Sequence, residues 1–186
     1  MRYSKLWMIW AAYFSRGSFK KLSKDYAQYT IGGIAMSWAS IETAIDGLTL
    51  VAYLNGGNAF SPSMPRSLSR KIVFLETSFK KLAFLTEVAN EGRALLARAD
   101  ALSNDRHWAI HGTVMEHMGN IDLEMKVEKI RREQHYFVFE RKTHSVADLA
   151  DIWEKSNNLA IELFQFVRPI IGQHLENEAN DAAGGR

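Results

Sequence analysis

The sequence predicts a mainly α-helical fold, an antiparallel bundle of long amphipathic helices with one inserted β-hairpin at about residues 121–140. Two observations support this prediction. Apolar residues recur at alternating steps of three and four in two long stretches, which is the period of a helix with one buried face. One later stretch instead alternates at every second residue, the period of a half-buried strand. Short connections between helices favour antiparallel neighbours.

The first helix is predicted over residues 24–53. Gly32 and Gly33 weaken its first turns, because glycine is a poor helix former, and Asn-Gly-Gly-Asn at 55–58 ends it. The apolar residues that set the period are Ile31, Ile34, Trp38, Ile41, Ile45, Leu48 and Ala52.

Two more helices are predicted after a loop at 61–65, which contains two prolines. Apolar spacing indicates one helix over 68–82 and another from about 90 to 102. Ser103-Asn104-Asp105 fits either the cap of a new helix or a kink before Arg106, and both readings stay open here. Gly112 places the end of this helical region anywhere between Gly112 and Gly119.

The hairpin follows, and a last long helix closes the fold. Residues 121–128 alternate apolar with polar side chains, and the aromatic-rich run 136–139 supplies the second strand. Ser145 and Asp148 have the spacing of a capping box, which indicates a helix start, and the apolar period continues to Ile170. The polar residues 176–186 are predicted to form a disordered tail, so residues 1–175 form a single domain.

Composition restricts the possible functions. Of the 186 residues 47% are hydrophobic and 24% charged, as in an ordinary globular protein, and a net charge of +2 is too small to argue for nucleic acid by itself. The absence of cysteine excludes disulfides and thiolate metal sites. The apolar run 6–14 is shorter than the roughly 18 residues of a membrane helix and has no cleavage site after it. We expect a short amphipathic or core-docking helix there, with attachment to a membrane surface as the alternative, and a cytoplasmic protein.

The most chemically suggestive segment is Arg106-His107-Trp108-Ala109-Ile110-His111-Gly112. Arg106 and His111 are about 140° apart around a helix, so they do not stack, but a long arginine can turn toward the imidazole. His107 and His111, four residues apart, share one face. An arginine binds phosphate oxygens with two hydrogen bonds, and a histidine titrates near neutral pH, so the pair suits phosphoryl chemistry.

This segment resembles the signature of HEPN domains, helical domains with an Arg, four to six residues and a His, and with a polar residue directly after the Arg. Here His107 is that polar residue, and Gly112 directly follows His111. Trp38 and Glu42 on an early helix, the hairpin and the closing helix agree with the resemblance, which covers roughly residues 25–172.

The resemblance implies a metal-independent endoribonuclease, such as a toxin or phage-defence component, that uses no cofactor. It implies a homodimer in which the Arg/His pairs of two protomers share a cleft, and it leaves room for an antitoxin or another partner protein. His111 would act as acid or base, Arg106 would stabilise the phosphorane, His107 would orient His111 or the phosphate, and Glu42 would orient Arg106. Attack by the ribose 2′-hydroxyl restricts the substrate to RNA.

Two other interpretations of the same residues remain open. In the first interpretation, Arg106 pairs with Glu42 or Asp105 and holds two helices together. The protein is then a non-catalytic module that binds a partner protein, RNA or a nucleotide. Alternatively, His107 and His111 bind zinc with Glu116 or His117 as a third ligand. A neighbouring Arg106 opposes a bound cation, and the sequence has no HExxH motif, so we expect no metal.

Overall fold

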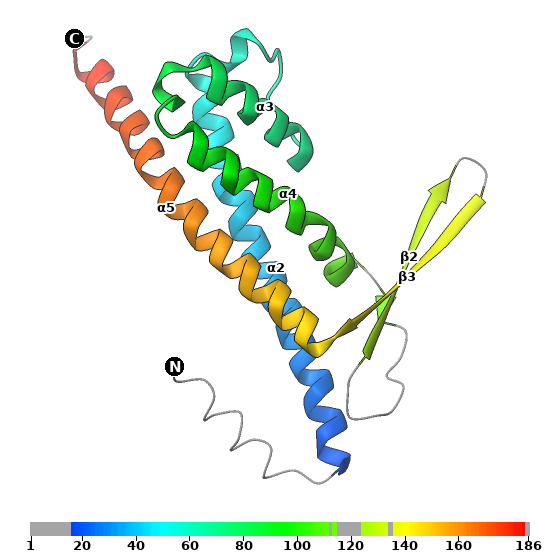
Figure 1. Ribbon diagram of the computed structural model, residues 1–186. Helices are drawn as coiled ribbons and strands as arrows, with labels where there is room; N and C mark the ends of the chain where they lie inside the picture. The colour runs from blue at the N-terminus through cyan, green and yellow to red at the C-terminus, as the bar shows by residue number, and fades with distance from the viewer. Residues whose placement is uncertain (1–15, 112, 115–123, 134–135, 185–186) are drawn as a thin grey trace.

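The computed structural model describes residues 16–111, 113–114, 124–133 and 136–184 (Figure 1). The described chain is mainly helical, which confirms the mainly α-helical part of the predicted fold class. The expected N-terminal helix at 6–14 lies outside the described residues. The elements are α2 (Arg16–Leu54), the short 3-10 turn η1 (Gly57–Ala59), α3 (Leu68–Lys81), the 3-10 turn η2 (Ala83–Leu85), α4 (Ala89–His111), β1 (Thr113–Val114), β2 (Glu124–Glu133), β3 (Tyr136–Ser145) and α5 (Val146–Gly184).

The three long helices α2, α4 and α5 alternate in direction (Figure 1). Arg98 near the middle of α4 binds Glu162, and Gly92, earlier in α4, meets Phe166, later in α5, so these two helices are antiparallel. In contrast, α2 and α5 are parallel, because Gly33 meets Trp153 and Gly47 meets Ile171. The predicted antiparallel arrangement is therefore corrected for this pair. When three long helices alternate in direction, the first and the third must point the same way.

The predicted apolar stripes form the core. Six of the seven residues expected to face inward from the first helix are buried, from Ile34 to Ala52. The main core cluster joins α2, α3, α4 and α5 around Trp38, Phe79 and Leu163. A smaller cluster lies near the end of α4, where Trp108 and Ala109 pack with Ile34, Leu149 and Ile152. This second cluster fixes the part of α4 that carries the Arg–His segment.

Two helices, α2 and α4, extend further than the sequence predicted. α2 begins at Arg16 rather than at residue 24. α4 is continuous from Ala89 to His111, with neither a new start nor a break at residues 103–105. The Ser103 hydroxyl donates to the carbonyl of Asp100 at 2.7 Å, so it bonds back within the helix instead of capping a new one.

The predicted disordered tail at 176–186 is wrong for residues 176–184, because α5 continues to Gly184. Leu175, Glu176, Ala179 and Asn180 in this part of the helix are exposed. An established helix adds further residues at low cost, and the glutamates and alanines of this segment favour the helical state.

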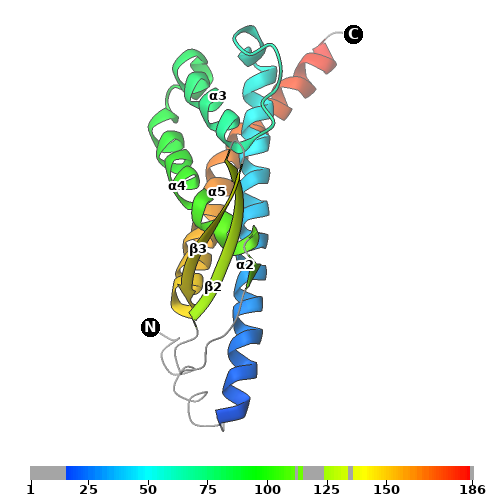
Figure 2. The same ribbon diagram turned by 90° about the vertical axis from the view of Figure 1, so that its right-hand side faces the viewer.

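β2 and β3 pair antiparallel, with Val127 opposite Lys142 and Ile130 opposite Phe139, and β1 pairs with β2. Residues 121–123 and 134–135 of the expected hairpin lie outside the described residues. Figure 1 and Figure 2 show that the ribbon of β2 and β3 leaves the helices where α5 begins. Here the predicted capping box is confirmed. The backbone N–H of Ser145 donates to Asp148 at 2.7 Å, and that of Asp148 donates to the Ser145 hydroxyl at 3.0 Å.

Candidate functional site

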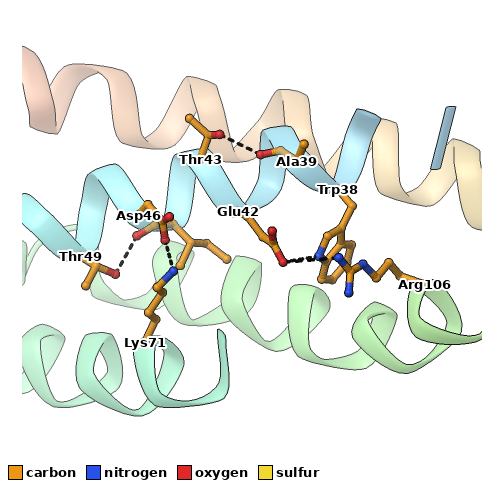
Figure 3. Close-up of polar contacts among 9 residues, drawn as sticks. Trp38, Ala39, Glu42, Thr43, Asp46, Thr49, Lys71 and Arg106 are labelled. Carbon is orange, nitrogen blue, oxygen red and sulfur yellow. Dashed lines mark hydrogen bonds and ion pairs between the residues drawn. The ribbon is translucent and has the colours of Figure 1, made fainter. Parts of the chain in front are cut away.

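Trp38 and Glu42 lie one turn apart on α2 and face α4 (Figure 3). The indole N–H of Trp38 donates to Oε1 of Glu42 at 2.8 Å. Trp38 is 1% exposed and belongs to the main core, whereas the Glu42 side chain is 44% exposed. A buried donor therefore fixes the orientation of a carboxylate that reaches the surface.

Arg106 of α4 meets both of these residues. Its Nη2 lies 3.8 Å from Oε1 of Glu42, and its guanidinium carbon lies 5.4 Å from the centre of the Trp38 ring. The first contact is an ion pair longer than a hydrogen bond, and the second is a cation–π contact. The Arg106 side chain is 24% exposed. The guanidinium is thus positioned by α2 and still reaches solvent.

The two histidines of the segment follow on the same helix. His107 is half-buried, and its neighbour Trp108 is buried in the second cluster. His111 is the last residue of α4, and its side chain lies outside the described residues. The regular helix separates the Cα atoms of Arg106 and His111 by roughly 7.5 Å along its axis and about 140° around it. Of the four predicted site residues, the described contacts bring together Arg106 and Glu42.

Asp105 takes no part in the contact of Arg106 with Glu42. Its Oδ1 accepts a hydrogen bond from Nζ of Lys142 at 2.9 Å, which ties α4 to β3. The sequence offered Glu42 and Asp105 as partners for Arg106, and the described ion pair is with Glu42.

His144 of β3 was assigned no role from the sequence, yet it is only 3% exposed. Burial lowers the pKa of its imidazole, and the positive charge of Lys142 lowers this pKa further, against the smaller opposing effects of Asp148 and Asp105. The sequence feature that could have identified His144 is its position directly before the cap residue Ser145, where the chain passes from strand to helix. Buried in this way, the ring favours its neutral form.

The metal site considered from the sequence falls largely outside the described residues. Within 16–111 and the later described ranges, no three His, Asp or Glu side chains gather closely enough to hold a metal ion. Glu116 and His117, the third ligands considered for zinc, lie outside the described residues, as does the side chain of His111. In the same described part of the chain, no helix has the length and apolar character needed to cross a membrane.

Comparison of this chain with protein-family models, with curated proteins and with solved structures finds no match.

Proposed function

We propose that the protein is a metal-independent endoribonuclease of the HEPN type, a toxin or phage-defence enzyme that works as a homodimer. The observation that carries the proposal is the position of Arg106. Glu42 and Trp38 hold its guanidinium at the surface, five residues before His111 on one continuous helix. A fixed and solvent-accessible cation on the same helix as a histidine suits metal-independent cleavage of a phosphodiester.

The proposed reaction uses only the nucleic acid and these side chains. A base takes the proton of the ribose 2′-hydroxyl, the 2′-oxygen bonds to phosphorus, and the bond from phosphorus to the 5′-oxygen breaks. An acid then gives a proton to that leaving oxygen. His111 of one protomer and His111 of the second supply the two proton transfers, with His107 orienting the first ring or the phosphate. The products are a 2′,3′-cyclic phosphate and a 5′-hydroxyl.

Arg106 stabilises the negative charge that builds up on the phosphorane oxygens. Glu42 is a positioning residue in this scheme, because its carboxylate acts through its contact with Arg106. At 3.8 Å, and with its oxygen also accepting the Trp38 N–H, the carboxylate orients the guanidinium without forming the short bidentate pair that would compete with phosphate.

Incubation of the purified full-length protein with labelled RNA in EDTA tests the proposal. We expect 2′,3′-cyclic phosphate ends and no cleavage of DNA of the same sequence. Arg106→Ala is expected to lower the rate by about 100-fold or more, and His111→Ala by a similar factor. His174→Ala is the control, because His174 bonds to Asn55 on another part of the bundle. Cleavage that survives both site substitutions, or none by well-folded protein on varied RNAs, would refute the proposal.

A second candidate, a non-catalytic interaction module, is favoured by the distribution of charge on α2 and α5. Between residues 26 and 54 the only charged side chains are Glu42 and Asp46, which extend toward α4 and α3 (Figure 3) and pair with Arg106 and Lys71. Between residues 156 and 167 of α5 the only one is Glu162, which pairs with Arg98 of α4. The remaining face of this helix pair is therefore uncharged.

That face also exposes apolar side chains. Met36 is 76% exposed, Ile161 50% and Phe164 45%, and they line a shallow hollow of about 440 Å³ between the two helices. This face is uncharged over residues 156–167 of α5 and the part of α2 that faces them, a length of roughly 18 Å. A second copy of this chain, with the same uncharged face, is the occupant that we propose.

The two candidates differ in what a substitution should do. Phe164→Glu would break a dimer formed through this face, and light scattering would show the mass fall to that of one chain. Phe84→Glu is the matched control, because Phe84 is 44% exposed, like Phe164, but lies in η2 and does not line this hollow. If Arg106→Ala and His111→Ala lower only the melting temperature and leave association intact, the interaction module stands. If both keep stability but remove a biological effect, that reading fails.

A further inference from the structure

A hollow of about 900 Å³ opens between the loop after η1 and α3, within the size range of small-molecule sites. Its lining residues lie between Phe60 and Thr77, and Figure 1 shows α3 away from the C-terminal end of α4. Its charged lining comes from Arg66, Arg70 and Lys71, and no acid lines it.

The ion pairs around this hollow leave two of its basic residues without an acidic partner among the described residues. Lys71 pairs with Asp46 of α2, and Glu76, the only acid between residues 60 and 81, pairs with Arg93 of α4. Arg66 and Arg70 are both exposed, and neither forms an ion pair or a side-chain hydrogen bond with any residue that the structure describes. Arg66 in the loop before α3 and Arg70 in its first turn both line the hollow, and two arginines without an acidic partner suit an anion with several oxygens.

The other walls of the hollow are apolar. Phe60 and Phe74 stack with their ring centres 5.6 Å apart, and Phe74 is buried, which makes this part of the wall rigid. Met64 and Val73 line the hollow as well and are 38% and 67% exposed. A ligand that fits here carries both a multiply charged oxyanion and a flat or apolar group.

We propose that this hollow binds a nucleotide, with its phosphate on Arg66 and Arg70 and its base against Met64 and Val73. The site is separate from the proposed cleavage centre and does not depend on it. The same chemistry, one phosphate with one base, is offered by a free nucleotide and by a nucleotide within a single strand. A strand would run from this hollow over the surface of the bundle.

Calorimetric titration of the full-length protein tests the proposal with three probes: AMP, inorganic phosphate, and a short single-stranded DNA, which lacks the 2′-hydroxyl and so is not cleaved by the proposed ribonuclease. We expect AMP to bind and phosphate to compete with it. Arg66→Gln and Arg70→Gln should each weaken AMP binding by about tenfold or more, since a hydrogen bond to a charged group is lost. Lys80→Gln is the matched control, because it removes an exposed positive charge from α3 that does not line the hollow.

Each outcome either identifies the source of the nucleotide, free or within a strand, or rules the site out. Binding of AMP that depends on both arginines assigns the hollow to a free nucleotide. Binding of the DNA strand alone, with the same dependence, assigns it to a nucleotide within a chain. Binding that Lys80→Gln weakens as much as Arg70→Gln overturns the proposal, and so does the absence of binding by either probe at millimolar concentration. Loss of RNA cleavage in Arg106→Ala leaves these results unchanged, so the two proposals fail separately.

Discussion

The indole ring of Trp153 in α5 packs directly onto the backbone of Gly33 in α2. A Cβ atom at position 33 would lie 2.5 Å from Cε2 of Trp153, whereas a Cβ at Gly32 would meet nothing within 4 Å. Tyr29 meets the same indole edge-on, with ring centres 5.5 Å apart. The close approach of the parallel helices α2 and α5 at this point therefore depends on Gly33 and not on the adjacent Gly32.

Alanine substitutions at these two glycines should change the free energy of unfolding in opposite directions. Gly33→Ala is expected to lower the free energy of unfolding by about 1–3 kcal/mol, because the new methyl group must displace Trp153. Gly32→Ala should raise it by about 0.5–1 kcal/mol, because alanine is the better helix former and has open space. Urea denaturation followed by circular dichroism measures both. Equal shifts of the same sign would contradict the packing described for Trp153.

The contact between Glu42 and Arg106 should contribute little to stability. In a double-mutant cycle with Glu42→Gln and Arg106→Gln, we expect a coupling free energy of about 0.5–1 kcal/mol, because both side chains are partly exposed and solvent screens the pair. The cycle is measured by urea denaturation. A coupling several times larger would mean that Arg106 serves mainly as a link between α2 and α4, and it would count against the ribonuclease proposal.

The capping box at the start of α5 should stabilise the fold in a pH-dependent way. Ser145→Ala is expected to cost about 1 kcal/mol, through the loss of a bond to the first turn. Hydrogen bonds from the backbone and side chain of Ser145 lower the pKa of Asp148. A lowered pKa in the folded state means that this contribution is present above the ordinary pKa of an aspartate and is lost as the pH falls through and below it.

Thermal melts between pH 6 and pH 3 measure this effect. Asp148→Asn should remove part of the acid-dependent loss of stability, whereas Asp151→Asn, one turn further along α5, should leave the part that depends on Asp148 in place. An identical pH profile for wild type and Asp148→Asn would show that the capping carboxylate adds nothing.

His144 should make the junction of β3 and α5 sensitive to mild acid. Its pKa in the folded protein is lowered by burial and then by Lys142, so the unfolded chain takes up a proton at a higher pH than the folded one. Stability is therefore full above the ordinary histidine pKa of about 6.5 and falls as the pH drops below it. His144→Gln should flatten the profile between pH 7.5 and pH 5.5, and His174→Gln should keep the loss that His144 causes. A wild-type profile that is flat over this range would contradict the prediction.

Local patterns in the sequence were enough for much of the fold. The alternating steps of three and four located the buried faces of α2 and α5, because that period follows from the geometry of a single helix. The pair Ser145 and Asp148 located the start of α5, since both bonds of a capping box form within one turn. The Ser103-Asn104-Asp105 signal did not interrupt α4. The buried residues Trp108 and Ala109, which follow it, pack in the second cluster from the continuous helix.

The relationships between distant residues were decided by packing. The sequence could name Arg106 and Glu42 as candidates, but only the crossing of α4 over α2 brought the guanidinium to that carboxylate and to the face of Trp38. The parallel direction of α2 and α5, the burial of His144 and the hollow around Arg66 and Arg70 arise in the same way. The sequence alone determined where helices form and which faces are apolar, because those properties depend on neighbours within a few residues. Which polar groups meet depended on how the helices pack, because the residues involved lie far apart along the chain.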